Sequence, residues 1–286
     1  MTSRSLRLVA LGLPALWMAC FFLAPFAILL TIALGESAEG LPPYASPFRD
    51  GGFTPNWANF AMLAEDGFYA EALLRSLRVA TVSASLCMLI GYPMALAIAR
   101  APERWRNPLL LAVMLPFWTS FLLRVTAWIG ILQDQGWLNA ALMGLGLTSE
   151  PVPLLYTEFA MYLGMSYGYL PFAVLPLYAS LSKQDPALEE AAFDLGATPW
   201  RVFLSVTLPL SLPGVVAAFL LVFIPACGEF VIPELLGGPS AQLVGRVLWT
   251  EFFQNRDWPL ASALAVAMLL LLVLPIAIFQ RRAAKA

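Results

Sequence analysis

The chain has 286 residues, of which 60% are hydrophobic and 12% are charged, with a mean hydropathy of +0.77 and a formal net charge of −2. This composition lies outside that of soluble globular domains and indicates a membrane protein. The sequence contains no histidine, the commonest general base and a common metal ligand. We therefore expect neither a catalytic site nor a metal site, and we expect no nucleic-acid partner.

Six apolar runs are each long enough to cross a bilayer. A helix rises about 1.5 Å per residue, so about 20 residues cross a hydrocarbon core about 30 Å thick. The first run is longer than the roughly 7–15 apolar residues of a signal-peptide core, so we expect it to be retained. The sequence therefore predicts an all-α membrane protein, a single domain over 1–286, with six transmembrane helices at about 8–34, 76–99, 109–132, 155–181, 213–236 and 259–280.

Three cysteines are scattered through these apolar runs: Cys20, Cys87 and Cys227. This distribution indicates small buried side chains and not a disulfide framework. The connection over 35–75 is rich in glycine and proline, and we expect one short surface helix near 56–72 within otherwise irregular structure.

Lysine and arginine are concentrated in alternate connections, and this distribution predicts the orientation. Segments rich in these residues lie in the cytoplasm according to the positive-inside rule. Ten of the sixteen basic residues fall in the N-terminal segment, two alternate loops and the C-terminal tail: Arg4, Arg7, Arg100, Arg104, Arg106, Lys183, Arg201, Arg281, Arg282 and Lys285. We therefore predict that both termini and the 182–212 loop lie on the cytoplasmic side of the membrane.

The 182–212 loop carries signals for a first helix. Asp185-Pro186 is a typical helix start, with Asp as the N-cap and Pro at the first helical position. Gly196 is able to adopt positive φ and is expected to end this helix. One face of the helix is apolar, with Leu188, Ala191, Ala192 and Leu195 at helical spacing.

A second short helix is expected to follow within the same loop. Thr198-Pro199 repeats the start signal, Leu208-Pro209 is expected to end the helix, and Pro213 is expected to begin the next span. The sequence thus predicts a rigid helix–turn–helix element. An amphipathic loop lying on the lipid headgroups is the alternative.

The stretch EAAFDLGATPWRVFLSVTLP at 190–209 resembles the EAA signature of the permease subunits of binding-protein-dependent ABC importers. That signature has E-A-A, a glycine, an aliphatic residue and a final L-P at fixed spacing. The chain places Gly196, Val206 and Leu208-Pro209 at the last three positions. The resemblance implies a type I ABC importer (MetI-like) permease fold.

The same resemblance implies that this loop docks on a cytoplasmic ABC ATPase dimer. It assigns Glu190 and Gly196 to the docking elbow, and Ala191 and Ala192 to a closely approached surface. We place Arg201 on the same coupling surface, and we expect Glu189 to be a solvated neighbour.

The segments MLPFWTSFLLRVTAWIGIL at 114–132 and GEFVIPELLGG at 228–238 resemble the spermidine/putrescine permeases of this family. This implies a polyamine substrate, a second permease subunit and a periplasmic substrate-binding protein. Relatives that move amino-acid derivatives leave an amino-acid-like substrate open.

The chain lacks a Walker A motif, because neither of its lysines, Lys183 and Lys285, is followed by serine or threonine. We therefore expect no cofactor in this chain, with ATP and Mg bound by the partner ATPase.

Charged side chains within spans are costly and are candidates for function. Arg124 and Glu229 each lie 16 residues from the predicted cytoplasmic start of a span, and their equal depth and opposite sign suggest an ion pair. Glu234 would then be the freer carboxylate for a cationic substrate. Trp118 and Tyr167 lie nearer the midplane and could bind ammonium groups through cation–π contacts, although packing alone would also explain them.

Two other function classes fit the sequence less well. A membrane-embedded enzyme would need a reactive cluster, and the chain has no histidine, no thiol cluster and no close carboxylate pair within its predicted spans. An ion-coupled secondary carrier receives little support, because no internal repeat is evident.

Overall fold

The computed structural model describes residues 3–49, 51–239 and 241–283, with the side chains of 11–49, 51–239 and 241–273. The chain divides into two compact units, Met1–Leu73 with Val247–Ala286 and Leu74–Arg246. Helices α4 and α13 each contribute residues to both units. The basic side chains that predict cytoplasmic termini (Arg4, Arg7, Arg281, Arg282 and Lys285) lie outside the described side chains.

The first unit begins with one continuous helical run, which covers most of the predicted span over 8–34 and ends at Ala33. It consists of α1 (Ser3–Met18), the π-helical turn η1 (Ala19–Leu23) and α2 (Ala24–Ala33). Pro25 in α2 cannot donate a backbone hydrogen bond, and its ring crowds the preceding turn, which accounts for the wider π-helical turn. The Asn59 side-chain amide donates to the carbonyls of Ala33 and Gly35, both at 2.9 Å, and so closes the end of α2.

The connection after α2 is more ordered than the sequence suggested. Two short antiparallel hairpins form, and their four strands are β1 (Glu36–Ser37) with β2 (Tyr44–Ala45) and β3 (Phe48–Arg49) with β4 (Gly52–Phe53). The expected surface helix is α3 (Ala58–Glu65), which is shorter than predicted. Asp66 adopts extended geometry and its carboxylate accepts the Phe68 N–H, which ends α3 and starts α4.

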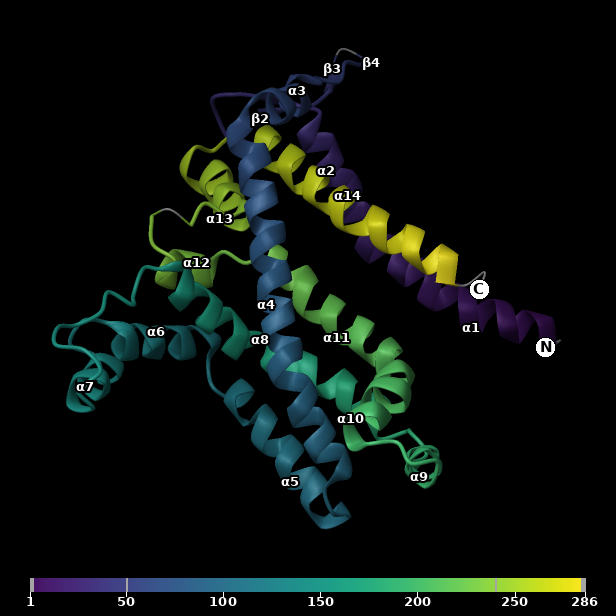
Figure 1. Cartoon of the computed structure of the whole chain (residues 1–286). Helices are drawn as coiled ribbons and strands as arrows, with labels where there is room; N and C mark the ends of the chain where they lie inside the picture. Colours follow the sequence, from purple (N-terminus) through teal and green to yellow (C-terminus); the bar gives the residue numbers. More distant parts are fainter. Residues whose placement is uncertain (1–2, 50, 240, 284–286) are drawn as a thin grey trace. The chain divides into compact units, whose positions relative to one another are not determined.

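The last helix, α14 (Trp258–Ala283), packs along α2 and α3 within this unit (Figure 1). A π-helical turn, η4 (Thr250–Gln254), precedes it. There the buried Glu251 accepts hydrogen bonds from the Tyr69 hydroxyl at 3.1 Å and the Asn255 amide at 2.8 Å. This carboxylate therefore ties η4 to the start of α4.

The second unit contains the remaining helices. In chain order they are the C-terminal part of α4 (Gly67–Arg100), α5 (Glu103–Met114), the 3₁₀ turn η2 (Leu115–Trp118), α6 (Phe121–Leu132), α7 (Trp137–Gly144), α8 (Glu158–Leu181), α9 (Pro186–Asp194), α10 (Pro199–Val202), the π-helical turn η3 (Phe203–Thr207), α11 (Leu208–Cys227), α12 (Val231–Leu236) and α13 (Val244–Trp249). Helix α11 packs along α8 (Figure 1).

The predicted single span over 109–132 is not one helix. Helix α5 with η2 and helix α6 with α7 are bent by 87° relative to each other. The break falls at Thr119 and Ser120, whose backbones are extended (ψ 155° and 135°), and the Thr119 hydroxyl donates to the Pro116 carbonyl at 2.8 Å. Pro116 removes a backbone donor and favours the tight 3₁₀ turn, and the following Thr-Ser pair competes for backbone hydrogen bonds.

The predicted end of a helix at Leu208-Pro209 is also wrong. Helices α10, η3 and α11 form one continuous run, Pro199–Cys227, and Pro213 lies inside it. Because Pro209 lacks an N–H, the chain widens into the π-helical turn η3 before it and continues as a helix. The predicted span over 213–236 therefore starts earlier, ends at Cys227, and is followed by the separate helix α12.

Within the described residues, three helices are long and apolar enough to cross a membrane: Leu11–Ala33, Gly67–Arg100 and Pro199–Cys227. The bent pair of α5–η2 and α6–α7 would make a fourth. Helices α8 and α14 occupy the predicted spans at 155–181 and 259–280. The count of six spans and the single-domain boundary stay predictions.

Helices α8 and α11 approach most closely at Gly214. A Cβ at this position would overlap the Ser180 Cβ and lie 3.2 Å from the Pro176 carbonyl oxygen. The pair then packs against α4 through a buried apolar cluster made of Ala95, Ile98, Val174, Leu177, Leu181 and Ala218. A side chain at position 214 would force the two helices apart.

We expect Gly214→Ala to destabilise the protein by about 1–3 kcal/mol, the usual cost of overpacking a tight contact. The matched control is Gly130→Ala in α6, where an added Cβ has no atom within 4 Å. Thermal unfolding of the detergent-solubilised protein would measure both. Equal unfolding temperatures for the two variants would contradict the close approach of α8 and α11.

Candidate functional site

Helix α9, Gly196 and helix α10 form the helix–turn–helix element that the sequence predicted. The Asp185 carboxylate accepts the Ala187 N–H at 3.0 Å as the N-cap of α9, with Pro186 in the first turn. Gly196 has φ +80°, the left-handed conformation that residues with a Cβ adopt at a cost of roughly 1–2 kcal/mol. Thr198 is the N-cap residue of α10, as expected.

The residues assigned to the coupling surface lie mainly at the surface of this element. Glu190, Ala191, Gly196 and Arg201 are exposed, and Ala192 is half-buried. Large apolar side chains beside them are also exposed, namely Leu188, Phe193, Leu195 (90% exposed) and Trp200 (69% exposed). The apolar face of α9 is therefore turned away from the rest of this unit and is available to another surface.

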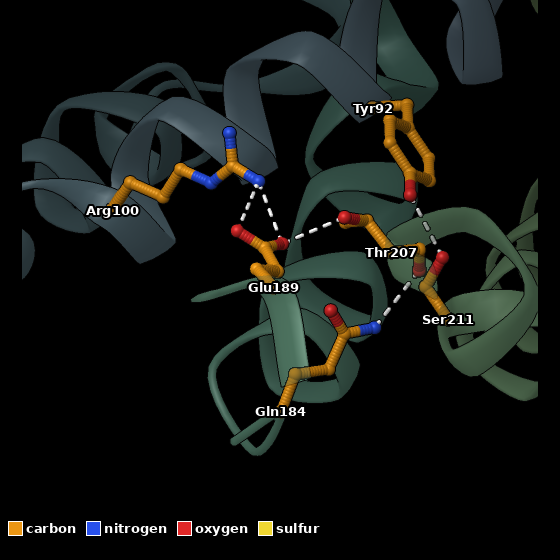
Figure 2. A network of polar contacts seen from close by, with 6 residues as sticks. All are labelled: Tyr92, Arg100, Gln184, Glu189, Thr207 and Ser211. Carbon is orange, nitrogen blue, oxygen red and sulfur yellow. Dashed lines mark hydrogen bonds and ion pairs between the residues drawn. The ribbon is translucent and has the colours of Figure 1, made fainter. Parts of the chain in front are cut away.

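Glu189 is not the solvated neighbour that the sequence suggested. Nη2 of Arg100, at the end of α4, donates to both carboxylate oxygens of Glu189 at 2.7 and 2.8 Å (Figure 2). The hydroxyl of Thr207, at the end of η3, donates to Glu189 Oε1 at 2.6 Å. One carboxylate on α9 is thus bound by two other helical elements.

The two bonds to Glu189 differ in energetic weight. Arg100 is 53% exposed, and ion pairs at exposed sites contribute about 0–1 kcal/mol. Thr207 is fully buried, and leaving a buried hydroxyl without its acceptor costs about 1–3 kcal/mol. The buried Thr207 bond is therefore the stronger constraint on α9. The sequence contained no local signal for it, because the partners lie 18 and 89 residues away.

A second set of polar contacts joins the neighbouring helices. The Gln184 side-chain amide donates to the Thr207 carbonyl at 3.0 Å. Tyr92 of α4 and Ser211 of α11 are hydrogen-bonded at 2.8 Å (Figure 2). Because the Ser211 hydroxyl already donates to the Leu208 carbonyl, Tyr92 acts as the donor.

Glu229 and Arg124 do not form the expected ion pair. Glu229 Oε2 accepts the Tyr169 hydroxyl, and Oε1 accepts the backbone N–H groups of Phe230, Val231 and Ile232 at 3.1, 2.9 and 3.4 Å. Glu229 therefore holds the start of α12. This role was missed because the sequence was interpreted as one helix through this position.

The Arg124 guanidinium lies over aromatic rings instead. Its central carbon is 4.8 Å from the centroid of Phe117 and 5.7 Å from that of Phe121, within cation–π range. Nε and Nη1 are buried and have no hydrogen-bond partner. A chain of ring contacts, Phe117–Phe172 at 5.1 Å and Phe172–Tyr169 at 6.2 Å, leads from Arg124 to the Tyr169 that binds Glu229.

The other substrate-pathway candidates are dispersed. Glu234 is not the freer carboxylate, because Nε of Arg246 contacts its Oε2 at 2.6 Å. Trp118 ends η2 at the helix break and is 78% exposed, while Tyr167 packs edge-on against Trp128 with centroids 5.5 Å apart. Among the described residues, no side-chain hydrogen bond, ion pair or ring contact joins Glu234, Trp118 and Tyr167 to one another. In the same part of the chain, no three His, Cys, Asp or Glu side chains are arranged to hold a metal ion.

Residues 2–286 match the family model of the binding-protein-dependent transport system inner membrane component. The chain belongs to this family. The permease is therefore a transport subunit of the inner membrane that crosses the bilayer several times, in agreement with its apolar helices.

Individual relatives agree with the family assignment. The permease is 37% identical over 265 residues to the spermidine/putrescine transport system permease protein PotB of Haemophilus influenzae, covering 93% of this chain and 90% of that one. It is 38% identical over 216 residues to PotB of Escherichia coli K12, covering 76% and 78%. The family and these two relatives confirm the resemblances identified in the sequence.

Solved structures support the fold. A bacterial alginate ABC transporter, in complex with an alginate pentasaccharide-bound periplasmic protein, has a chain that is similar with a TM-score of 0.67. The alignment covers 96% of the permease and 93% of that chain at 20% identity. The predicted importer-permease fold is therefore confirmed.

We expect Arg124 and Glu229 to show no energetic coupling. Glu229→Ala removes the acceptor for three backbone N–H groups and for Tyr169, and should destabilise the protein by at least about 1–2 kcal/mol. Glu229→Gln keeps an acceptor oxygen and should cost less. Thermal unfolding of single variants and of the double variant with Arg124→Leu gives the coupling, and a charge-swapped double variant that is more stable than either single one would contradict this arrangement.

Proposed function

We propose that the permease forms half of the translocation pathway of an ATP-driven polyamine importer. In this proposal a second permease subunit, a paralogue, supplies the other half. A periplasmic protein delivers putrescine or spermidine, and a separate cytoplasmic ATPase dimer binds ATP and Mg and supplies the energy. The observation that carries the proposal is the rigid element formed by α9, Gly196 and α10, with its exposed apolar face.

The geometry of this element suits a docking role. Leu188, Leu195 and Trp200 together expose apolar surface next to Glu190 and Arg201, and none of them is buried in the core of the second unit. Burial of apolar surface contributes about 25 cal/mol per Å², so covering these side chains would stabilise a complex. Glu190 and Arg201 would add charged contacts at the rim of the contact surface.

The names of the two relatives support a polyamine substrate. The acidic candidates Glu229 and Glu234 are already bound within the chain, so recognition of ammonium groups would rely more on aromatic faces such as those of Trp118 and Tyr167. Arg124 supports the alternative of an amino-acid-like substrate. Its buried Nε and Nη1 have no hydrogen-bond partner and are suited to donate to the carboxylate of such a substrate.

The test is to purify the complete transporter, reconstitute it in proteoliposomes and add its binding protein loaded with different solutes. Loading with putrescine or spermidine should stimulate ATP hydrolysis and accumulate solute inside the vesicles. Stimulation by an amino acid and not by a polyamine would support the alternative. If no ATPase co-purifies with the permease, the importer proposal fails.

The exposed side chain of Leu195 allows a direct test of ATPase docking. We expect Leu195→Asp to leave the thermal stability of the permease unchanged, because the side chain is 90% exposed, but to weaken co-purification of the ATPase at least about tenfold. The matched control is Leu147→Asp, an exposed leucine outside the element. Equal ATPase recovery with both variants would contradict docking on α9.

A further inference from the structure

Helix α9 is held in place mainly by polar contacts. None of its nine residues is fully buried, so apolar burial contributes little to its position. Its N-terminal link passes through Gln184 and Asp185, and its C-terminal link passes through the turn at Gly196. The side chain that fastens the middle of the helix is Glu189.

The Glu189 carboxylate joins three helical elements at one point. Oε1 accepts from both Arg100 at the end of α4 and Thr207 at the end of η3, directly before α11 (Figure 2). The Gln184 amide holds the Thr207 carbonyl from the other side, so the backbone on which Thr207 lies is itself fixed. The Tyr92–Ser211 hydrogen bond joins α4 to α11 next to this group.

The shared oxygen makes this arrangement cooperative. A displacement of α9 relative to α4 and η3 beyond hydrogen-bond range would break the bonds from Arg100 and Thr207 together and leave the buried Thr207 hydroxyl without its acceptor. A displacement of this size is therefore favourable only when the ends of α4 and α11 move with α9.

We propose that Glu189, Arg100 and Thr207 are positioning residues that make α9 move as one unit with the ends of α4 and α11. This inference rests on the proposed function, because it describes how a force applied by the ATPase at the exposed face of α9 reaches the membrane helices. Weakening the contact would leave the ATPase docked and active but would transmit less of its motion. ATP hydrolysis would then be partly uncoupled from transport.

The decisive comparison is Thr207→Val with Thr207→Ser in the complete reconstituted transporter. Valine has the shape of threonine but lacks the hydroxyl, whereas serine keeps the donor. For Thr207→Val we expect the ATP hydrolysed per solute transported to rise about fivefold, the size of one lost net hydrogen bond, with the ATPase still bound. Thr207→Ser should stay near wild type.

The Arg100 contact is tested in the same way. Arg100→Gln should raise the amount of ATP hydrolysed per solute transported. Arg100→Lys keeps the charge, so its ratio should lie closer to that of the wild type. The matched control is Arg104→Gln, which removes a neighbouring exposed arginine and should leave the ratio unchanged. A wild-type ratio in both Thr207→Val and Arg100→Gln, with intact assembly, would overturn the inference.

Amide hydrogen exchange on the assembled protein provides a second measurement that does not depend on transport. Thr207→Val should speed amide exchange in α9 and leave exchange in α8 unchanged, because the lost hydrogen bond holds only α9. Unchanged exchange in α9 would overturn the inference even if a variant transports poorly. A wild-type complex without an associated ATPase would instead refute the proposed function, so the two failures are distinguishable.

Discussion

The close approach of α8 and α11 is the constraint on which the rest of the second unit depends. At Gly214 the two helices leave no space for a side chain, and this fixes the distance between their ends. Gln184 follows the end of α8, and the same contact brings it within reach of the Thr207 carbonyl at the end of η3. It also places the Thr207 hydroxyl near Glu189 of α9, and Ser211 of α11 near Tyr92 of α4. The position of α9 is therefore set by helix packing.

The helix is continuous from α10 through α11, and this continuity links α10 directly to a membrane helix. The π-helical turn η3 lets the chain pass Pro209 without ending the helix, so α10 and α11 form one continuous rod. Helix α9 joins the same rod through Thr207 and Glu189. In the proposed importer, both halves of the docking element would thus move with the membrane helices and not as an independent loop.

Local features of the site could be predicted from the sequence because their signals are local. The N-cap at Asp185, the positive φ of Gly196 and the second start at Thr198 each depend on one or two neighbouring residues.

The effect of a proline on a helix depends on its environment. The sequence therefore predicted a helix end at Leu208-Pro209 that does not form, and missed the break after Pro116. Depth along a span likewise suggested pairing Arg124 with Glu229, whereas their partners are set by the fold: Tyr169 and the backbone of α12 for Glu229, and aromatic rings for Arg124.

In the proposed importer, α9 and the end of α4 move together during the transport cycle. Spin labels at Ala97→Cys in α4 and Asp194→Cys in α9, both exposed positions, would report their distance by electron paramagnetic resonance in the complete transporter after replacement of Cys20, Cys87 and Cys227. We predict the same distance distribution without nucleotide and with ATP bound. A distribution that shifts when ATP binds would contradict the joint motion of α9 and α4.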